Sequence, residues 1–171
     1  MKQTTLRGAI ARLDERRLRT LIFEFASLRK ENTDWLKAKF LGAEDITELL
    51  ERYKGKITHA FHSRRINLRK AKQAIADFKK ISNAPKYIVE LMIFYVETGI
   101  ALENEYGDLY ESFYASIESV YEKIILILNK NPQFISEFKQ RLSEVVDNSS
   151  EGWGHRDTLY ELYKELKGDN E

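Results

Sequence analysis

The chain has 171 residues, 43% of them hydrophobic and 32% charged, and its formal net charge is +1. This is the composition of a folded protein, because a disordered chain would hold fewer aromatic residues and a larger net charge. The absence of cysteine excludes disulfides and thiolate metal sites. We find neither the roughly 20 apolar residues that span a bilayer nor the apolar core of a signal peptide. We therefore expect a cytoplasmic protein with one domain over residues 1–171 and no membrane partner.

The net charge conceals an uneven distribution. Residues 1–80 hold 20 Lys/Arg and 10 Asp/Glu, whereas residues 81–171 hold 8 and 17. Two explanations remain open. The basic half presents a face to nucleic acid or another anionic partner, or the two halves pack together and neutralise each other.

Apolar residues recur at a spacing of three to four nearly everywhere, which predicts helices. A short helix over about residues 4–12 comes first, and Asp14 is the predicted N-cap of the second helix. Leu18, Leu21, Ile22, Phe25 and Leu28 are predicted to make one apolar face of that helix. A third helix carries Trp35, Leu36 and Phe40. Asp45 is the predicted N-cap of a fourth, whose apolar stripe runs from Ile46 to Phe61.

The fifth helix is predicted to turn Leu68, Ala71, Ile75 and Phe78 inward. Pro85 suits the first turn of a sixth helix, which is apolar on almost every side and should be the buried central one, near residues 85–106. Gly107 ends it, Asp108 with Glu111 caps the seventh helix, and Asn131-Pro132 opens the eighth. The predicted fold is all-α, a single irregular bundle of about eight or nine helices, with a short α-solenoid as the alternative.

A basic tract extends over residues 52–80, with ten Lys/Arg and one acid, Asp77. If the fifth helix begins early, several of these cations fall along one side of it and could follow a phosphate backbone. That side lacks the aromatic residues that would stack bases, which favours a solvated face or one docked on the acidic half. The candidate anion- or nucleic-acid-binding residues are Arg64, Arg65, Arg69, Lys72 and Lys80.

A second candidate is a polar cluster around the sixth helix. Glu90 and Glu97 are its only charged residues between positions 87 and 102, and a spacing of seven puts them on one side. Buried carboxylates require partners, so either this edge faces solvent or the pair meets an arginine or histidine from another helix, for which His155 and Arg156 are the candidates. We expect a structural ion pair in preference to a reaction site.

The last polar loop leads into the stretch GWGHRDTLYELY, residues 152–163. Asp157 or Thr158 is the predicted N-cap of the final helix, with Trp153 anchored in the core. His59 and His62 share a helix face but lack a carboxylate at helical spacing. We therefore predict no metal, no cofactor and no catalytic residue.

The stretches LRKAKQAIADFKK…LMIFYVETGIALENEYGDLYESFYASIESVYEK and GWGHRDTLYELY resemble a family of small bacterial all-helical proteins described only as a domain of unknown function. The resemblance covers roughly residues 5–167, most specifically 68–123 and 152–163. It implies an all-helical fold and supplies no activity, substrate or site residue.

Three functions remain as hypotheses. The first is a non-enzymatic module that binds or regulates another protein. The second is nucleic-acid binding through the tract 52–80. The third is a small ligand-binding protein or enzyme that uses the acidic helix 85–106 and the loop 152–157.

Overall fold

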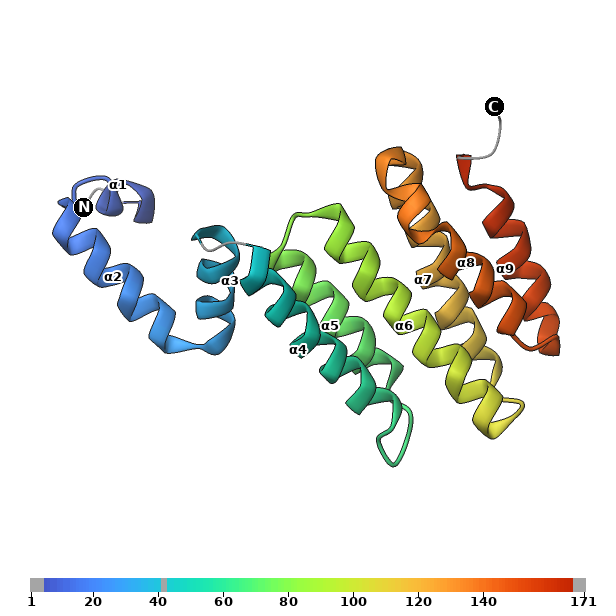
Figure 1. The fold of residues 1–171 in the computed structure, drawn as a ribbon. Coiled ribbons are helices and arrows are strands. Elements are labelled where there is room, and N and C mark those ends of the chain that lie inside the picture. Colours follow the sequence, from blue (N-terminus) through green and yellow to red (C-terminus); the bar gives the residue numbers. More distant parts are fainter. Residues whose placement is uncertain (1–4, 41–42, 168–171) are drawn as a thin grey trace. The chain divides into compact units, whose positions relative to one another are not determined.

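The computed structural model describes residues 5–40 and 43–167. Within these ranges the regular structure consists of nine α-helices and two 3₁₀ turns, without a strand (Figure 1). The all-α prediction is therefore confirmed. Contacts between helices divide the chain into two compact units, Met1–Ile46 and Thr47–Glu171. The single domain over residues 1–171 remains a prediction.

The first unit holds three helices, α1 (Leu6–Ile10), α2 (Glu15–Leu28) and α3 (Lys30–Phe40). Asp14 caps α2 as predicted, because its carboxylate accepts a hydrogen bond from the Arg17 N–H at 2.7 Å. The turn between α2 and α3 is fixed by side chains: the Thr33 hydroxyl donates to the Ala26 carbonyl at 2.8 Å.

The apolar face of α2 is not buried within this unit. No residue of α1 or α2 is buried, and the exposed large apolar side chains include Ile22, Phe25 and Leu28. Trp35 and Phe40 of α3 are exposed as well. Three short helices provide too little volume to enclose a core.

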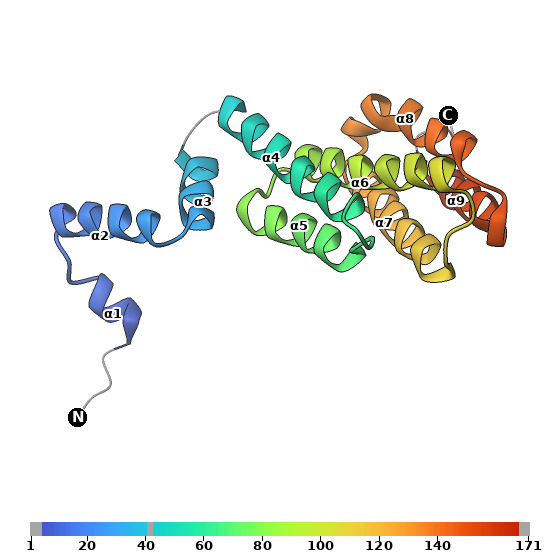
Figure 2. The same ribbon diagram turned by 90° about the horizontal axis from the view of Figure 1, so that it is seen from below.

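The second unit is an irregular bundle of the remaining helices. Its central member is α6, which contacts α5, α7 and α8, while α9 packs on α7 and α8 (Figures 1 and 2). In a solenoid each repeat would contact only its neighbours along the chain. The helices are α4 (Ala43–Phe61), α5 (Leu68–Ile81), α6 (Pro85–Tyr106), α7 (Glu111–Lys130), α8 (Ile135–Asn148) and α9 (His155–Lys164).

The core of the bundle forms around α6, as its apolar sequence predicts. Ten of its residues are buried, and rings from α4, α5 and α7 pack edge-on in the same core. Gly99 lets α6 and α7 approach closely, since a Cβ there would collide with Ile117. The predicted buried central helix is thus confirmed.

Several helix ends were predicted correctly. Pro85 occupies the first turn of α6, and Gly107 ends that helix with a φ of 79°. Asp14 caps α2 as predicted. The cap of α5, which was not predicted, is Asn67, which accepts from the Lys70 N–H. The predicted cap at Asp45 lies outside the described side chains, and α4 already begins at Ala43.

Two caps were predicted wrongly. Tyr110, rather than Asp108, precedes α7, and no side chain caps that helix. The final helix begins at His155, before the predicted caps, because His155 is buried against α7 and α6. Gly154 (φ 68°) and Trp153 (φ 56°) make the turn, and Trp153 is 71% exposed instead of anchored in the core.

Candidate functional site

Glu90 and Glu97 share a partner that the sequence did not reveal. Arg141 of α8 donates from Nε and Nη2 to the two carboxylate oxygens of Glu97, both at 2.8 Å, and from Nη1 to Glu90 at 2.5 Å. Lys54 of α4 lies 3.0 Å from the other oxygen of Glu90. Three helices are therefore tied together by one bidentate and two single ion pairs.

The pKa shifts in this group are those of a satisfied ion-pair network. Burial would raise the pKa of Glu90, but hydrogen bonds from Arg141 and Lys54 outweigh it and hold that pKa below its ordinary value. The pKa of Arg141 is raised chiefly by its hydrogen bonds to Glu97. A small hollow of about 250 Å³ lies beside Arg141, between α6 and α8. Because both carboxylates are already neutralised, they have little capacity to bind a cation or move a proton.

His155 joins a different pair of carboxylates. Its Nδ1 lies 2.7 Å from Glu118 of α7, and its Nε2 lies 3.7 Å from Glu103 of α6. The side chains of His155 and Glu103 have no exposed surface. Burial raises the pKa of Glu103 and outweighs the hydrogen bond from the Ser150 N–H. The histidine does reach the central helix, but at a carboxylate 13 residues from Glu90.

Arg156 holds its own loop together. Its guanidinium donates to the carbonyl oxygen of Ser149 and to the carboxylate of Glu151, the latter at 3.1 Å. The four residues of the predicted polar cluster therefore separate: Glu90 and Glu97 lie together, while His155 and Arg156 are the first two residues of α9. Each group has structural partners within the described chain.

The predicted basic residues are distributed over three environments. Arg64 and Arg65 are exposed in the loop before α5, and Lys80 pairs with Asp77 at 2.9 Å. Arg69 and Lys72 line a groove instead. Only these last two thus share one site.

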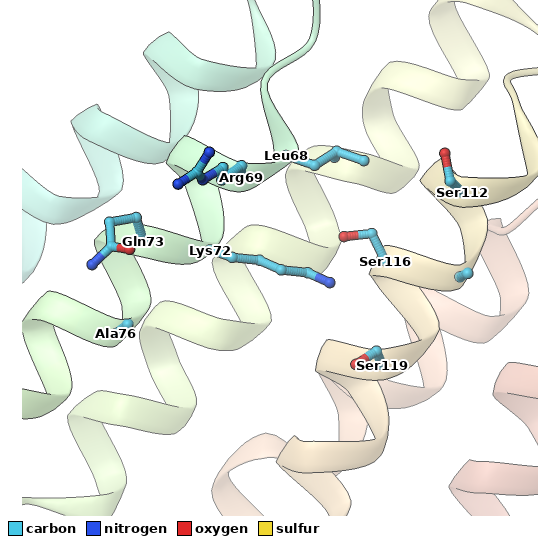
Figure 3. Close-up of a pocket in the computed structure, with 9 residues that line it drawn as sticks. Leu68, Arg69, Lys72, Gln73, Ala76, Ser112, Ser116 and Ser119 are labelled. Carbon is cyan, nitrogen blue, oxygen red and sulfur yellow. The ribbon is translucent and has the colours of Figure 1, made fainter.

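This groove, which we call the α5–α7 groove, is an open depression of about 720 Å³ within the bundle (Figure 3). One wall is α5, with Arg69 and Lys72, and the other is α7, from which serine side chains project toward the same space. No acidic side chain is among the residues that line it. Those residues are Leu68, Arg69, Lys72, Gln73, Ala76, Ser112, Ala115, Ser116 and Ser119.

The surroundings of two α5 lysines, Lys72 in the groove and Lys79 further along the helix, disfavour their charged form. Burial lowers the pKa of Lys72 and of Lys79, and the positive charge of Lys123 on α7 lowers both further. Lys123 itself donates a hydrogen bond to the Ser119 hydroxyl at 3.3 Å. Within the described part of the chain Arg69, Lys72 and Lys79 make no ion pair.

Sequence reasoning missed one wall of this groove. Ser112, Ser116, Ser119 and Lys123 recur at a spacing of three to four along α7 and so lie on one face of that helix. This polar stripe beside the apolar one is the signal that could have found the wall. Lys79 of α5 is not among the predicted site residues.

In residues 5–40 and 43–167, no three His, Asp or Glu side chains are grouped in a way that could hold a metal ion. No helix of this part of the chain has the length and apolar character to cross a membrane. Comparison with protein-family models, with curated proteins and with solved structures gives no match to this chain. The resemblance to a bacterial helical family stays a prediction.

Proposed function

We propose that this chain is a non-enzymatic protein-interaction module that docks on another protein through the apolar face of α2. The observation that carries the proposal is the exposure of that face. Leu18, Ile22 and Phe25 recur at intervals of three or four along one side of the helix. Leu18 is half-buried, Ile22 and Phe25 are exposed, and Leu28 continues them at 74% exposure.

Scattered apolar residues are ordinary on protein surfaces, but a continuous apolar face indicates a binding surface. Covering one such side chain is worth about 1.5–3 kcal/mol. An amphipathic helix that places residues at this spacing into an apolar groove is a common mode of protein recognition.

The charges around the face favour an acidic partner. Residues 5–40 hold nine Lys/Arg and five Asp/Glu, and Arg16 and Arg17 belong to α2 itself. Such charges accelerate association with a complementary surface and make the rate salt-dependent. The partner that fits is a protein with an apolar groove and an acidic rim.

A photo-crosslinking amino acid at position 22 tests the proposal in the full chain, with position 160 of α9 as an equally exposed control. We expect one protein to crosslink from position 22 and not from position 160. Purified, it should bind the chain, and Ile22→Glu should weaken that binding at least tenfold while Tyr160→Glu leaves it unchanged.

Two results would overturn the proposal. One is a captured protein whose affinity is the same for Ile22→Glu and for the unaltered chain. The other is self-association of the purified chain that Ile22→Glu abolishes, because the face would then join two copies of this chain.

A further inference from the structure

The α5–α7 groove brings together positive charges that the fold does not neutralise. Several cations elsewhere in the same unit are paired, for example Arg141 with Glu90 and Glu97, and Lys86 with Glu137 at 2.7 Å. Arg69, Lys72 and Lys79 have no such partner among the described residues. Instead, Lys123 faces them from the opposite wall, and the pKa of both lysines falls. A bound anion would remove this repulsion.

The cations extend along α5, from Arg69 and Lys72 in the groove to Lys79 beyond its last lining residue on that helix, rather than converging on one point. Arg69 and Lys79 are ten residues apart on one helix, which corresponds to about 15 Å at 1.5 Å per residue. A nucleic-acid strand carries one charge per about 3.4 Å of duplex axis, so this length faces about four phosphates. A single phosphate would use only part of it.

The opposite wall supplies hydroxyl groups. Ser112 makes no hydrogen bond within the described chain. Ser119 accepts one from Lys123 and keeps its own proton to donate. Ser116 is already bonded to the Tyr95 hydroxyl at 2.8 Å. Hydroxyls opposite lysines and an arginine form a donor set suited to phosphate oxygens.

No aromatic side chain lines the groove. Binding of single strands usually relies on aromatic rings that stack on bases, whereas contacts to a duplex backbone need only cations and hydrogen-bond donors. The arrangement therefore favours the backbone of a duplex over a single strand, and binding without reading of base sequence.

We propose that the α5–α7 groove binds the sugar–phosphate backbone of a duplex nucleic acid. Arg69, Lys72 and Lys79 contact successive phosphates, and the hydroxyls of Ser112 and Ser119 donate to phosphate oxygens. This site lies entirely in the second unit and goes beyond the protein docking proposed for α2.

The experiment measures fluorescence anisotropy of short labelled RNA and DNA duplexes with the full chain, in salt from about 50 to about 200 mM. The test variant is Lys72→Gln/Lys79→Gln, and the control is Lys86→Gln/Lys164→Gln, which removes the same charge from lysines paired with glutamates. We expect the test variant to bind roughly tenfold more weakly at low salt. Its plot of log affinity against log salt should be shallower by about two, with the control nearly unchanged.

Circular dichroism and thermal melts check that each variant folds, and Ser112→Ala/Ser119→Ala provides a second test that leaves the charges in place. Its binding should weaken at every salt concentration with the slope retained. Inorganic tripolyphosphate and a single strand of the same sequence distinguish the sources of phosphate, and we expect both to compete poorly with the duplex.

The proposal fails if the chain binds no duplex at low salt, or if the test variant retains both its affinity and its salt slope. It also fails if tripolyphosphate or the single strand binds more tightly than the duplex. Ile22→Glu should leave duplex binding unchanged, so failure here and failure of the α2 docking surface are separate results.

Discussion

At the scale of single residues, Lys72 is a position where charge opposes folding. Burial and the charge of Lys123 lower its pKa from 10.5. Between the lowered value and 10.5 the folded chain binds fewer protons than the unfolded chain, so stability rises with pH through that window. The penalty is fully present at neutral pH. We expect Lys72→Met to raise the melting temperature at pH 7, by an amount that shrinks as the pH approaches 10.5.

Lys164→Met is the matched comparison, because the hydrogen bond to Glu161 raises the pKa of Lys164. Its substitution should lower the melting temperature slightly at pH 7. Thermal unfolding followed by circular dichroism at both ends of this pH range measures the two effects. A lower melting temperature for Lys72→Met at pH 7 would contradict the expectation. A residue retained at a cost to stability is typical of a binding site.

The raised pKa of Glu103 predicts how folding stability changes with pH in the acid range. Burial raises its pKa above 4.5, and the folded chain therefore binds more protons than the unfolded chain between 4.5 and the raised value. Stability contributed by this group is lost as pH rises through that window. Glu103→Gln keeps a side-chain oxygen that accepts from the Ser150 N–H. It should remove the loss of stability that the unaltered chain shows as the pH rises.

Urea unfolding from about pH 4 to pH 8 measures this change. Relative to the unaltered chain, Glu103→Gln should gain stability as the pH rises. Glu90→Gln should show the opposite trend, because interactions with Arg141 and Lys54 lower the pKa of Glu90 and its stabilising contribution is lost in acid. If the Glu103→Gln profile stays parallel to that of the unaltered chain, the assignment is wrong.

At the scale of elements, the contact between α6 and α7 depends on Gly99. A Cβ at this position would collide with the Cδ1 of Ile117 and lie 3.1 Å from its Cγ1. Overpacking costs about 1–3 kcal/mol, more than the gain of up to about 1 kcal/mol from the higher helix propensity of alanine. Gly99→Ala should therefore lower the free energy of unfolding.

Gly55 of α4 is the control, because a Cβ there meets nothing within 4 Å. Gly55→Ala should raise the free energy of unfolding by about 0.5–1 kcal/mol. Adding Ile117→Val to Gly99→Ala removes the colliding methyl group and should recover part of the loss. Urea denaturation measures the free energy of unfolding of the three variants, Gly99→Ala, Gly55→Ala and Gly99→Ala/Ile117→Val. Stabilisation by Gly99→Ala would show that the helices have room to separate.

Local periodicity predicted the elements of the bundle well. The apolar stripes of α5, α7 and α8 repeat at helical spacing, and the residues on them are almost all buried. The same periodicity on α2 predicted which face is apolar but not whether anything covers it. Amphipathicity is a property of one helix, whereas burial depends on the neighbours that the fold supplies.

For the candidate sites, too, the sequence predicted residues of the site but not the partners that the fold brings to them. The sequence shows that Glu90 and Glu97 need a cation, yet Arg141 is 44 residues beyond Glu97 and on another helix. Glu118, which pairs with His155, is 37 residues away from it. Such partners are selected by tertiary packing. The groove was half predicted, through Arg69 and Lys72, because α7 supplies the other wall.

At the scale of the whole molecule, the basic and acidic halves do not simply cancel within the second unit. Lys54 and Glu90 join them at one point in the bundle, at 3.0 Å. The α5 cations along the groove instead face serines and Lys123. Charge is thus balanced where α4, α6 and α8 meet and left unbalanced along the α5–α7 groove, which is the distribution that the nucleic-acid proposal requires.

The two compact units should also differ in local stability. Backbone amides exchange with solvent when their hydrogen bonds open, and opening is easy where few apolar groups are buried. No residue of α2 is buried in its unit, whereas α6 buries ten. In deuterium-exchange mass spectrometry of the dilute chain we expect α1 and α2 to exchange first and α6 and α7 last. Strong protection of α2 in the chain alone would mean that its apolar face is already covered, leaving no free surface for a partner protein. If α2 exchanges rapidly in the chain alone and slowly once the partner is bound, the partner covers the apolar face that the first unit leaves exposed.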